Sequence, residues 1–182
     1  MDQKKLEQAA RLIIEAVGED PEREGLVETP RRFAEMVAEQ LAYAAVPNEE
    51  IARAFDKTFS SPESDMVVVK DISLFSHCEH HIALMYNMKA AVGYIPRGRV
   101  IGLSKIARIA DAVSKRLQIQ ERIGADIRDI MERITGAGDV IVLLEGEHSC
   151  MTARGIRKPG TLTRTISASG RFRTCLLYTS DA

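Results

Sequence analysis

Histidine and cysteine are scarce in this chain and gather at two places that lie far apart in the sequence. The chain has four histidines and three cysteines. All but Cys175 lie in or directly beside the runs Cys78-Glu79-His80-His81 and His148-Ser149-Cys150. Thiolate sulfur and imidazole nitrogen are the ligands that zinc prefers in proteins. The clustering therefore predicts a metal site built from two distant segments, which the fold has to bring together.

The spacing within the two runs limits which residues can bind one ion. Cys78 and His81 are three residues apart, close enough in a turn to share a metal. His148 and Cys150 are two apart, and in an extended strand their side chains would point to the same side. His80 and His81 are neighbours whose side chains diverge, so we expect only one of them to bind the metal.

We predict Cys78, His81 and Cys150 as the ligands, which leaves His80 and His148 free. Three protein ligands with one open position are typical of a catalytic zinc, whereas structural zinc sites usually have four. Such an ion acidifies a bound water, and spare histidines are natural proton carriers at neutral pH. The alternative is that the cysteines are small core residues and the histidines polar strand-end residues, because neither a CxxC nor an HExxH motif is present.

Hydrophobic periodicity predicts an α+β fold, with N-terminal helices followed by a ββααββ unit. Thr29 is expected to cap a helix that has Pro30 at its first position. The two later helices have little between them, which favours an antiparallel helical hairpin on one face of an antiparallel sheet. Open sheet edges favour an oligomer. The expected helices cover residues 6–17, 29–43, a short stretch from 47, 106–117 and 123–134, and the expected strands 66–75, 82–95, 140–144 (covered on both faces) and 162–172.

Two further segments have the composition of a nucleotide site. Ser104 is expected to cap a helix with Lys105 and Arg108 in its first turn, which would suit phosphate; the alternative is a capped helix with solvated basic residues. Arg154 follows Cys150 closely and so lies near the metal. Gln120-Glu121 opens the next helix, where a carboxylate can accept two hydrogen bonds from a guanine edge or simply complement the helix dipole.

Charge and hydropathy limit the partners. The formal net charge is −1 and 28% of residues are charged, so no global field favours nucleic acid or an anionic membrane. No apolar run approaches the roughly 18 residues of a membrane span, and no signal peptide is evident. Three cysteines without disulfide-rich spacing fit a reducing compartment. We therefore expect a soluble, cytoplasmic protein with no nucleic-acid or membrane partner.

Six segments in the right order, from about Gly25 to Arg173, resemble the GTP cyclohydrolase I family. They are Thr29-Pro30-x-Arg32, Ser76-x-Cys78-Glu79-His80-His81, Gly93-Tyr94-Ile95-Pro96, Gly102-Leu103-Ser104-Lys105-x-x-Arg108, Gln118-x-Gln120-Glu121-Arg122 and His148-x-Cys150-Met151-x-x-Arg154-Gly155. Each segment alone is weak, but the combination is specific.

The resemblance implies a reaction, a site and an assembly. The reaction is the zinc-dependent hydrolytic opening of the GTP imidazole ring, with formate released and 7,8-dihydroneopterin triphosphate formed, as the first step of folate- and tetrahydrobiopterin-type pterin biosynthesis. The fold implied is the tunnelling fold, with subunits joined into a ring, rings paired into a homodecamer and active sites between subunits. The matching residues are Cys78, His81 and Cys150 as zinc ligands, His80 and His148 as an acid–base pair, Ser104 assisting at the ribose, and Lys105, Arg108, Gln120, Glu121 and Arg154 as further substrate contacts.

The chain departs from the family pattern at two places. Glu35 stands where many relatives carry a lysine, so no phosphate contact is assigned there. The second departure is the C-terminal end. We interpret residues 1–62 as an N-terminal helical region, 63–174 as the catalytic tunnelling-fold domain and 175–182 as a truncated or non-native tail.

The rival functions are a non-catalytic zinc- or pterin-binding oligomer, which would not need both spare histidines, and another pterin enzyme of the same fold, whose ligands would differ.

Overall fold

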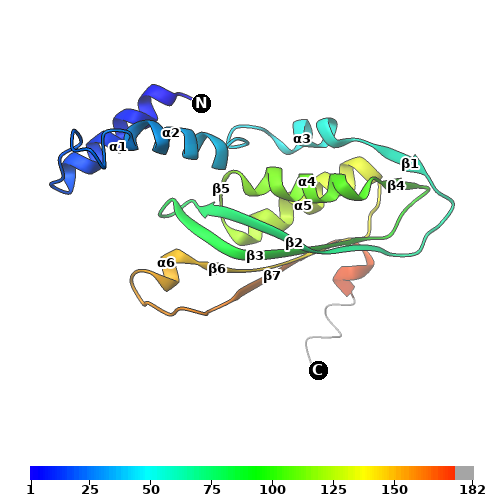
Figure 1. The fold of residues 1–182 in the computed structure, drawn as a ribbon. Helices are drawn as coiled ribbons and strands as arrows, with labels where there is room; N and C mark the ends of the chain where they lie inside the picture. Colours follow the sequence, from blue (N-terminus) through cyan, green and yellow to red (C-terminus); the bar gives the residue numbers. More distant parts are fainter. Residues whose placement is uncertain (175–182) are drawn as a thin grey trace. The chain divides into compact units, whose positions relative to one another are not determined.

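The structure, a computed structural model, describes residues 1–174 of the chain and forms two compact units, Met1–Ala44 and the part from Ala45 onward (Figure 1). The interpretation of residues 175–182 as a tail, and with it Cys175, falls outside the described residues. None of the described helices is long and apolar enough to cross a membrane.

The first unit is a pair of packed helices, α1 (Gln3–Ala16) and α2 (Thr29–Gln40). The predicted end of α1 is confirmed, because Gly18 adopts a φ of 86°, which glycine reaches without strain. The predicted cap of α2 is wrong: Thr29 is already helical, and Glu28 at the N-cap position makes no side-chain capping bond. Pro30 lies in the first turn as expected, but the helix stops at Gln40 rather than near residue 43.

The second unit is built on a five-stranded sheet with the order β5-β2-β3-β6-β7. The ββααββ order is confirmed. The expectation of a purely antiparallel sheet is wrong in one detail, because the short strand β5 pairs parallel to the end of β2. A separate antiparallel pair joins β1 and β4, which the sequence pattern did not indicate. The strands are β1 (Thr58–Ser60), β2 (Val67–Cys78), β3 (Ala83–Tyr94), β4 (Arg99–Ile101), β5 (Leu117–Gln118), β6 (Val140–His148) and β7 (Thr163–Ala168).

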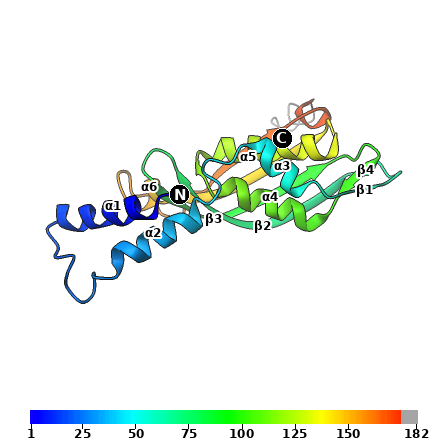
Figure 2. The ribbon, with the colours of Figure 1, turned by 90° about the horizontal axis from the view of Figure 1, so that it is seen from above.

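Three helices, α3 (Asn48–Phe55), α4 (Leu103–Ser114) and α5 (Gln120–Thr135), lie on one face of this sheet (Figures 1 and 2). The apolar faces of α4 and α5 are the predicted ones: Ile106, Ile109 and Val113 of α4, and Ile123, Ile127, Ile130 and Ile134 of α5, are buried. Helix α4 packs on β2, and α5 on β6 and β7. Helix α3, grouped above with residues 1–62, packs on α4 and α5 within this second unit.

Several helices and strands differ from the prediction in their ends or their burial, because tertiary contacts decide these features. Helix α4 stops at Ser114, and Leu117, expected as its last apolar position, lies in β5 against β2. Strand β6 is not covered on both faces: Val142 is fully buried whereas Leu143 is 42% exposed. The last strand ends at Ala168 instead of near residue 172, because the chain turns at Gly170, whose φ is 54°.

Candidate metal and acid–base site

The two predicted ligand segments meet at one end of the sheet. Cys78 is the last residue of β2, and the turn 79–82 carries His81 before β3 begins. Cys150 lies in α6 (Ser149–Thr152), a single helical turn that directly follows β6. Strands β3 and β6 pair next to each other, with Met85 opposite His148, so the start of one and the end of the other coincide. This pairing brings together segments that are far apart in the sequence.

The donor atoms of Cys78, His81 and Cys150 all lie within 4.8 Å of one another. The Cys78 sulfur is 4.0 Å from Nδ1 of His81. A tetrahedral zinc with bonds of about 2.0–2.3 Å separates its ligand atoms by roughly 3.7 Å, so small side-chain movements would close the set. Two thiols and one imidazole also match the donor preference of zinc. The three residues therefore fit a metal of this type.

The environment of the two sulfur atoms also favours a bound cation. Cys78 is buried and Cys150 half-buried. Burial, together with the neighbouring Cys78, raises the pKa of the Cys150 thiol above its ordinary value. Two thiolates side by side repel each other, and a divalent cation between them would favour the deprotonated forms. The pair is thus suited to a cation.

Arg154 lies beside the cluster, as its closeness to Cys150 in sequence predicted. Its Nη1 donates to Nε2 of His81 at 2.8 Å. A neutral imidazole has one lone pair free for a donor or a metal, since its other nitrogen carries the proton. Whichever nitrogen binds a metal, Nε2 then has no lone pair for the guanidinium. Metal coordination and this hydrogen bond are therefore mutually exclusive, and a bound ion frees Arg154 for another acceptor.

His148 is held by Gln120, for which the family resemblance implied a substrate contact. The Gln120 side chain is buried, and its amide nitrogen donates to the carbonyl oxygens of Leu144 and Thr163 at 3.2 and 2.9 Å. These two acceptors fix the amide orientation, so its oxygen accepts from Nε2 of His148 at 2.9 Å. The proton of neutral His148 therefore sits on Nε2, and Nδ1 remains free to accept a proton.

The backbone between His148 and Cys150 is not the single extended strand that was predicted. The two residues do not share an extended strand, because β6 ends at His148 and Cys150 belongs to α6. Burial lowers the pKa of His148, against a smaller opposite effect of the Glu121 carboxylate, so His148 is mainly neutral at pH 7. Glu121 is exposed in the first turn of α5, as predicted. His80 is exposed on the turn, with its ring centre 6.5 Å from that of His81.

The structure does not place the predicted phosphate-binding residues at this cluster. These residues are Ser104, Lys105 and Arg108. They lie in the first two turns of α4, whose last residue, Ser114, accepts a 2.6 Å hydrogen bond from Ser76 at the metal end of β2. Ten helical residues at 1.5 Å each place Ser104 roughly 15 Å further along the helix. Ser104 is also not the cap: Gly102 occupies the N-cap position, without a side-chain capping bond. One chain therefore presents the two halves of the predicted site at opposite ends of α4.

Sequence reasoning missed three polar features around the metal turn. His77, next to Cys78, is half-buried, and its Nδ1 has no hydrogen-bond partner among residues 1–174. Glu79 forms a two-bond ion pair with Arg122. A buried amide, Gln118, pairs with Cys78 across β5 and β2. Glu79, Gln118 and Arg122 all lie in the motifs that carry the family resemblance, which was the available signal.

The chain is similar to several known proteins. The family profile described as GTP cyclohydrolase I matches residues 6–176. The GTP cyclohydrolase 1 of Clostridium acetobutylicum is 56% identical over 95% of this chain and 91% of its own length. That of Clostridium beijerinckii is 53% identical over 100% of this chain and 95% of its own. Among solved structures, the apo form of an archaeosine synthase QueF-Like aligns with a TM-score of 0.46 and 18% identity, covering 60% of this chain and 96% of that one.

Proposed function

The chain belongs to the GTP cyclohydrolase I family, and we propose that it is a zinc-dependent enzyme that opens the imidazole ring of GTP by hydrolysis. The products are formate and 7,8-dihydroneopterin triphosphate. The observation that carries the proposal is the convergence of the donor atoms of Cys78, His81 and Cys150, with His148 two residues before Cys150 and its proton held on Nε2 by Gln120. Equimolar formate release from GTP tests it.

Cys78, His81 and Cys150 would hold the zinc ion. When bound, zinc supplies Lewis acidity and an activated water at neutral pH. Arg154, freed from Nε2 of His81, becomes available to an anionic group of the substrate, and its exposed guanidinium can form two parallel bonds to a phosphate. Metal binding at His81 and phosphate binding are thereby linked through the Arg154 side chain.

His148 and His80 serve as the proton carriers. The bond from Nε2 of His148 to Gln120 leaves Nδ1 as the atom that takes or delivers a proton near the metal. We assign protonation of the guanine N7 to His148 and the later proton transfers to the exposed His80. Gln120 acts by orienting His148, because both ends of its amide are already occupied within the chain.

Glu121 reads the guanine edge in this proposal. Its carboxylate is exposed, lies in the first turn of α5 and is close enough to His148 to affect its pKa. Two carboxylate oxygens match the N1–H and amino donors of guanine, whereas an amide presents one acceptor and one conflicting donor.

Glu121→Gln is therefore expected to lower kcat/KM for GTP by about 10- to 150-fold, the range for hydrogen bonds to charged groups of about 1.5–3 kcal/mol. Steady-state kinetics with GTP measure this. Glu132→Gln, on the same helix and in an ion pair with Arg128, is the matched control and should leave kcat/KM unchanged. Equal kcat/KM values for Glu121→Gln and the unsubstituted protein would refute the role.

We further propose that Ser104, Lys105 and Arg108 complete the site of a neighbouring chain, in a ring that pairs into a decamer. The distance along α4 between these residues and the metal cluster supports this arrangement. Ser104 would act at the ribose, and Lys105 and Arg108 would bind the triphosphate together with Arg154. β5 and β7 are the edge strands of the described sheet, and edge strands are where further strands can pair.

Specific activity is accordingly expected to fall on dilution, as rings dissociate and sites lose the residues from the neighbour. Activity assays across a dilution series, combined with light scattering, measure this dependence. A species with the mass of one chain and undiminished activity would contradict a shared site.

A further inference from the structure

We propose that the ion pair between Glu79 and Arg122 is a positioning device for the metal ligands, which holds the turn 79–82 in the conformation that directs His81 toward Cys78. Glu79 and Arg122 are positioning residues in this inference, because neither contributes a donor atom to the cluster. The inference rests on the proposed zinc site, and deepens it by naming what sets the affinity of that site.

The turn 79–82 is conformationally unfavourable at its last residue. Ile82 has a φ of 51°, in the left-handed region that β-branched residues rarely adopt. Its side chain is 63% exposed, so packing does little to offset the strain. Such backbone conformations persist when the surrounding contacts impose them, and they concentrate at functional sites. Something next to the turn therefore has to hold it.

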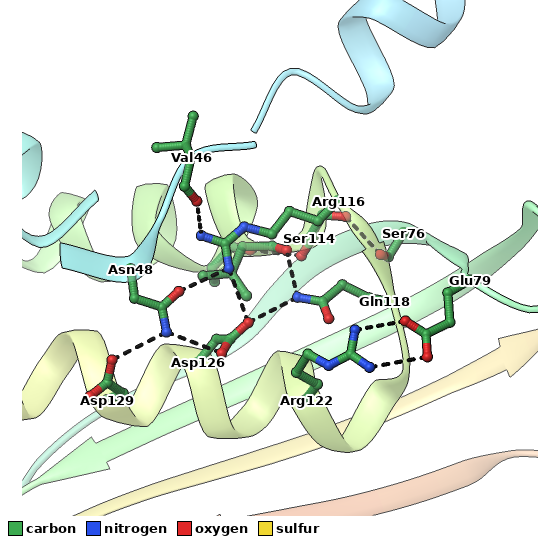
Figure 3. Close-up of polar contacts among 12 residues, drawn as sticks. Val46, Asn48, Ser76, Glu79, Ser114, Arg116, Gln118, Arg122, Asp126 and Asp129 are labelled. Atoms are coloured by element: carbon green, nitrogen blue, oxygen red, sulfur yellow. Dashed lines mark hydrogen bonds and ion pairs between the residues drawn. The ribbon is translucent and has the colours of Figure 1, made fainter. Parts of the chain in front are cut away.

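Glu79 makes the contacts that hold the turn. Its backbone N–H donates to the carbonyl oxygen of Gln118 at 3.0 Å. Its two carboxylate oxygens accept from Nη1 and Nη2 of Arg122 at 2.7 and 3.0 Å, a two-bond arrangement that fixes direction as well as distance (Figure 3). Because Glu79 lies between Cys78 and His80, restraining it restrains the start of the turn.

One partner of Glu79, Gln118, is itself fixed by a polar network, and the other, Arg122, lies on the same helix as Asp126 of that network. Asp126 accepts from Nη1 of Arg116 and from the buried amide of Gln118, both at 3.0 Å, and Asn48 contacts Arg116 and Asp126 (Figure 3). This network joins β5 to α5, so the Gln118 carbonyl and the Arg122 side chain approach the turn from one rigid support. A rigid support is what orients a metal ligand effectively.

The first turn of α5 thereby acts on both ligand segments. Gln120 holds His148 at the end of β6, two residues before Cys150. Arg122 holds Glu79, one residue after Cys78. Two residues of one helical turn, Gln120 and Arg122, thus set the positions of the two segments that supply the metal donors. Loss of the Arg122 bonds releases one segment while the other stays in place.

Zinc affinity of the full chain, measured under reducing conditions by competition with a chromophoric chelator, tests the proposal. Arg122→Gln and Glu79→Gln are each expected to weaken zinc binding by about tenfold, the lower end of the effect of residues that orient metal ligands. The double variant should be no weaker than either single one, because both remove the same interaction. Additive losses, or an affinity for Arg122→Gln within twofold of the unsubstituted protein, would overturn the inference.

Arg133→Gln is the matched control, since Arg133 lies on the same helix, is similarly exposed and bonds both oxygens of Asp129. It should bind zinc as the unsubstituted protein does, while the melting temperature falls equally little in Arg122→Gln and Arg133→Gln. Adding Ile82→Asn to Arg122→Gln should restore affinity to within about threefold of the unsubstituted protein, because asparagine tolerates the left-handed region. No recovery would refute the strained turn. Absence of zinc from the unsubstituted protein would instead refute the proposed metal site.

Discussion

Replacing Cys78, His81 or Cys150 with Ala is expected to reduce both bound zinc and GTP turnover to background. The three donor atoms lie within 4.8 Å of one another, and the removal of any one leaves two ligands, too few for a stable site. Metal analysis should show about one zinc per chain in the unsubstituted protein and almost none in the purified variants. Cys175→Ala, which changes the third cysteine, is the thiol control and should keep its zinc.

This result depends on which residues bind the metal and not on general damage to the fold. Cys150 is only half-buried, so its replacement by Ala removes a donor at small cost to packing. Far-ultraviolet circular dichroism of Cys150→Ala should match that of the unsubstituted protein. A folded Cys150→Ala variant that still holds about one zinc per chain would show that another residue is the ligand.

Replacing His148 with Ala is expected to behave differently: zinc stays bound and turnover falls by about two to four orders of magnitude, the usual contribution of a positioned acid–base group. The reason lies in the hydrogen bond from Nε2 to Gln120, which leaves Nδ1 as a proton carrier outside the ligand set. Single-turnover kinetics and metal analysis of the same sample measure both quantities.

His77→Gln is the matched control for this experiment. His77 is also half-buried and sits next to a ligand, but alternation along β2 directs its side chain away from that of Cys78. It should keep turnover within severalfold of the unsubstituted protein. Loss of zinc from His148→Ala would show that His148 is a ligand, and unchanged turnover would show that it carries no proton in the reaction.

The sequence predicted the elements whose signals are local and repeated. The isoleucines of α5 recur over about three turns and face the sheet as expected, and Gly136 ends the helix in a left-handed conformation. The pattern failed where tertiary contacts decide. Leu117 continues the apolar spacing of α4, yet it pairs with His77 in β5, a strand too short to have a pattern of its own. Alternating exposure in β6 likewise depends on which face the helices cover.

The metal cluster could be predicted because its residue types are rare, whereas the roles around it could not. Nothing in the sequence distinguishes a glutamine that contacts a substrate from one that orients a histidine. The role of Gln120 follows only from the positions of Leu144 and Thr163, which come from β6 and the start of β7. The separation of Ser104 from the cluster is equally invisible in sequence, because it depends on the direction in which α4 runs.

Formate release per GTP consumed is the measurement that tests a zinc-dependent imidazole-ring hydrolase most directly. We expect the zinc-loaded chain to release formate equimolar with the GTP that disappears, and Cys150→Ala prepared in parallel to release none. GTP consumption without formate would mean that the chain cleaves a different bond. A zinc-loaded, assembled protein that leaves GTP intact would contradict the proposed function altogether.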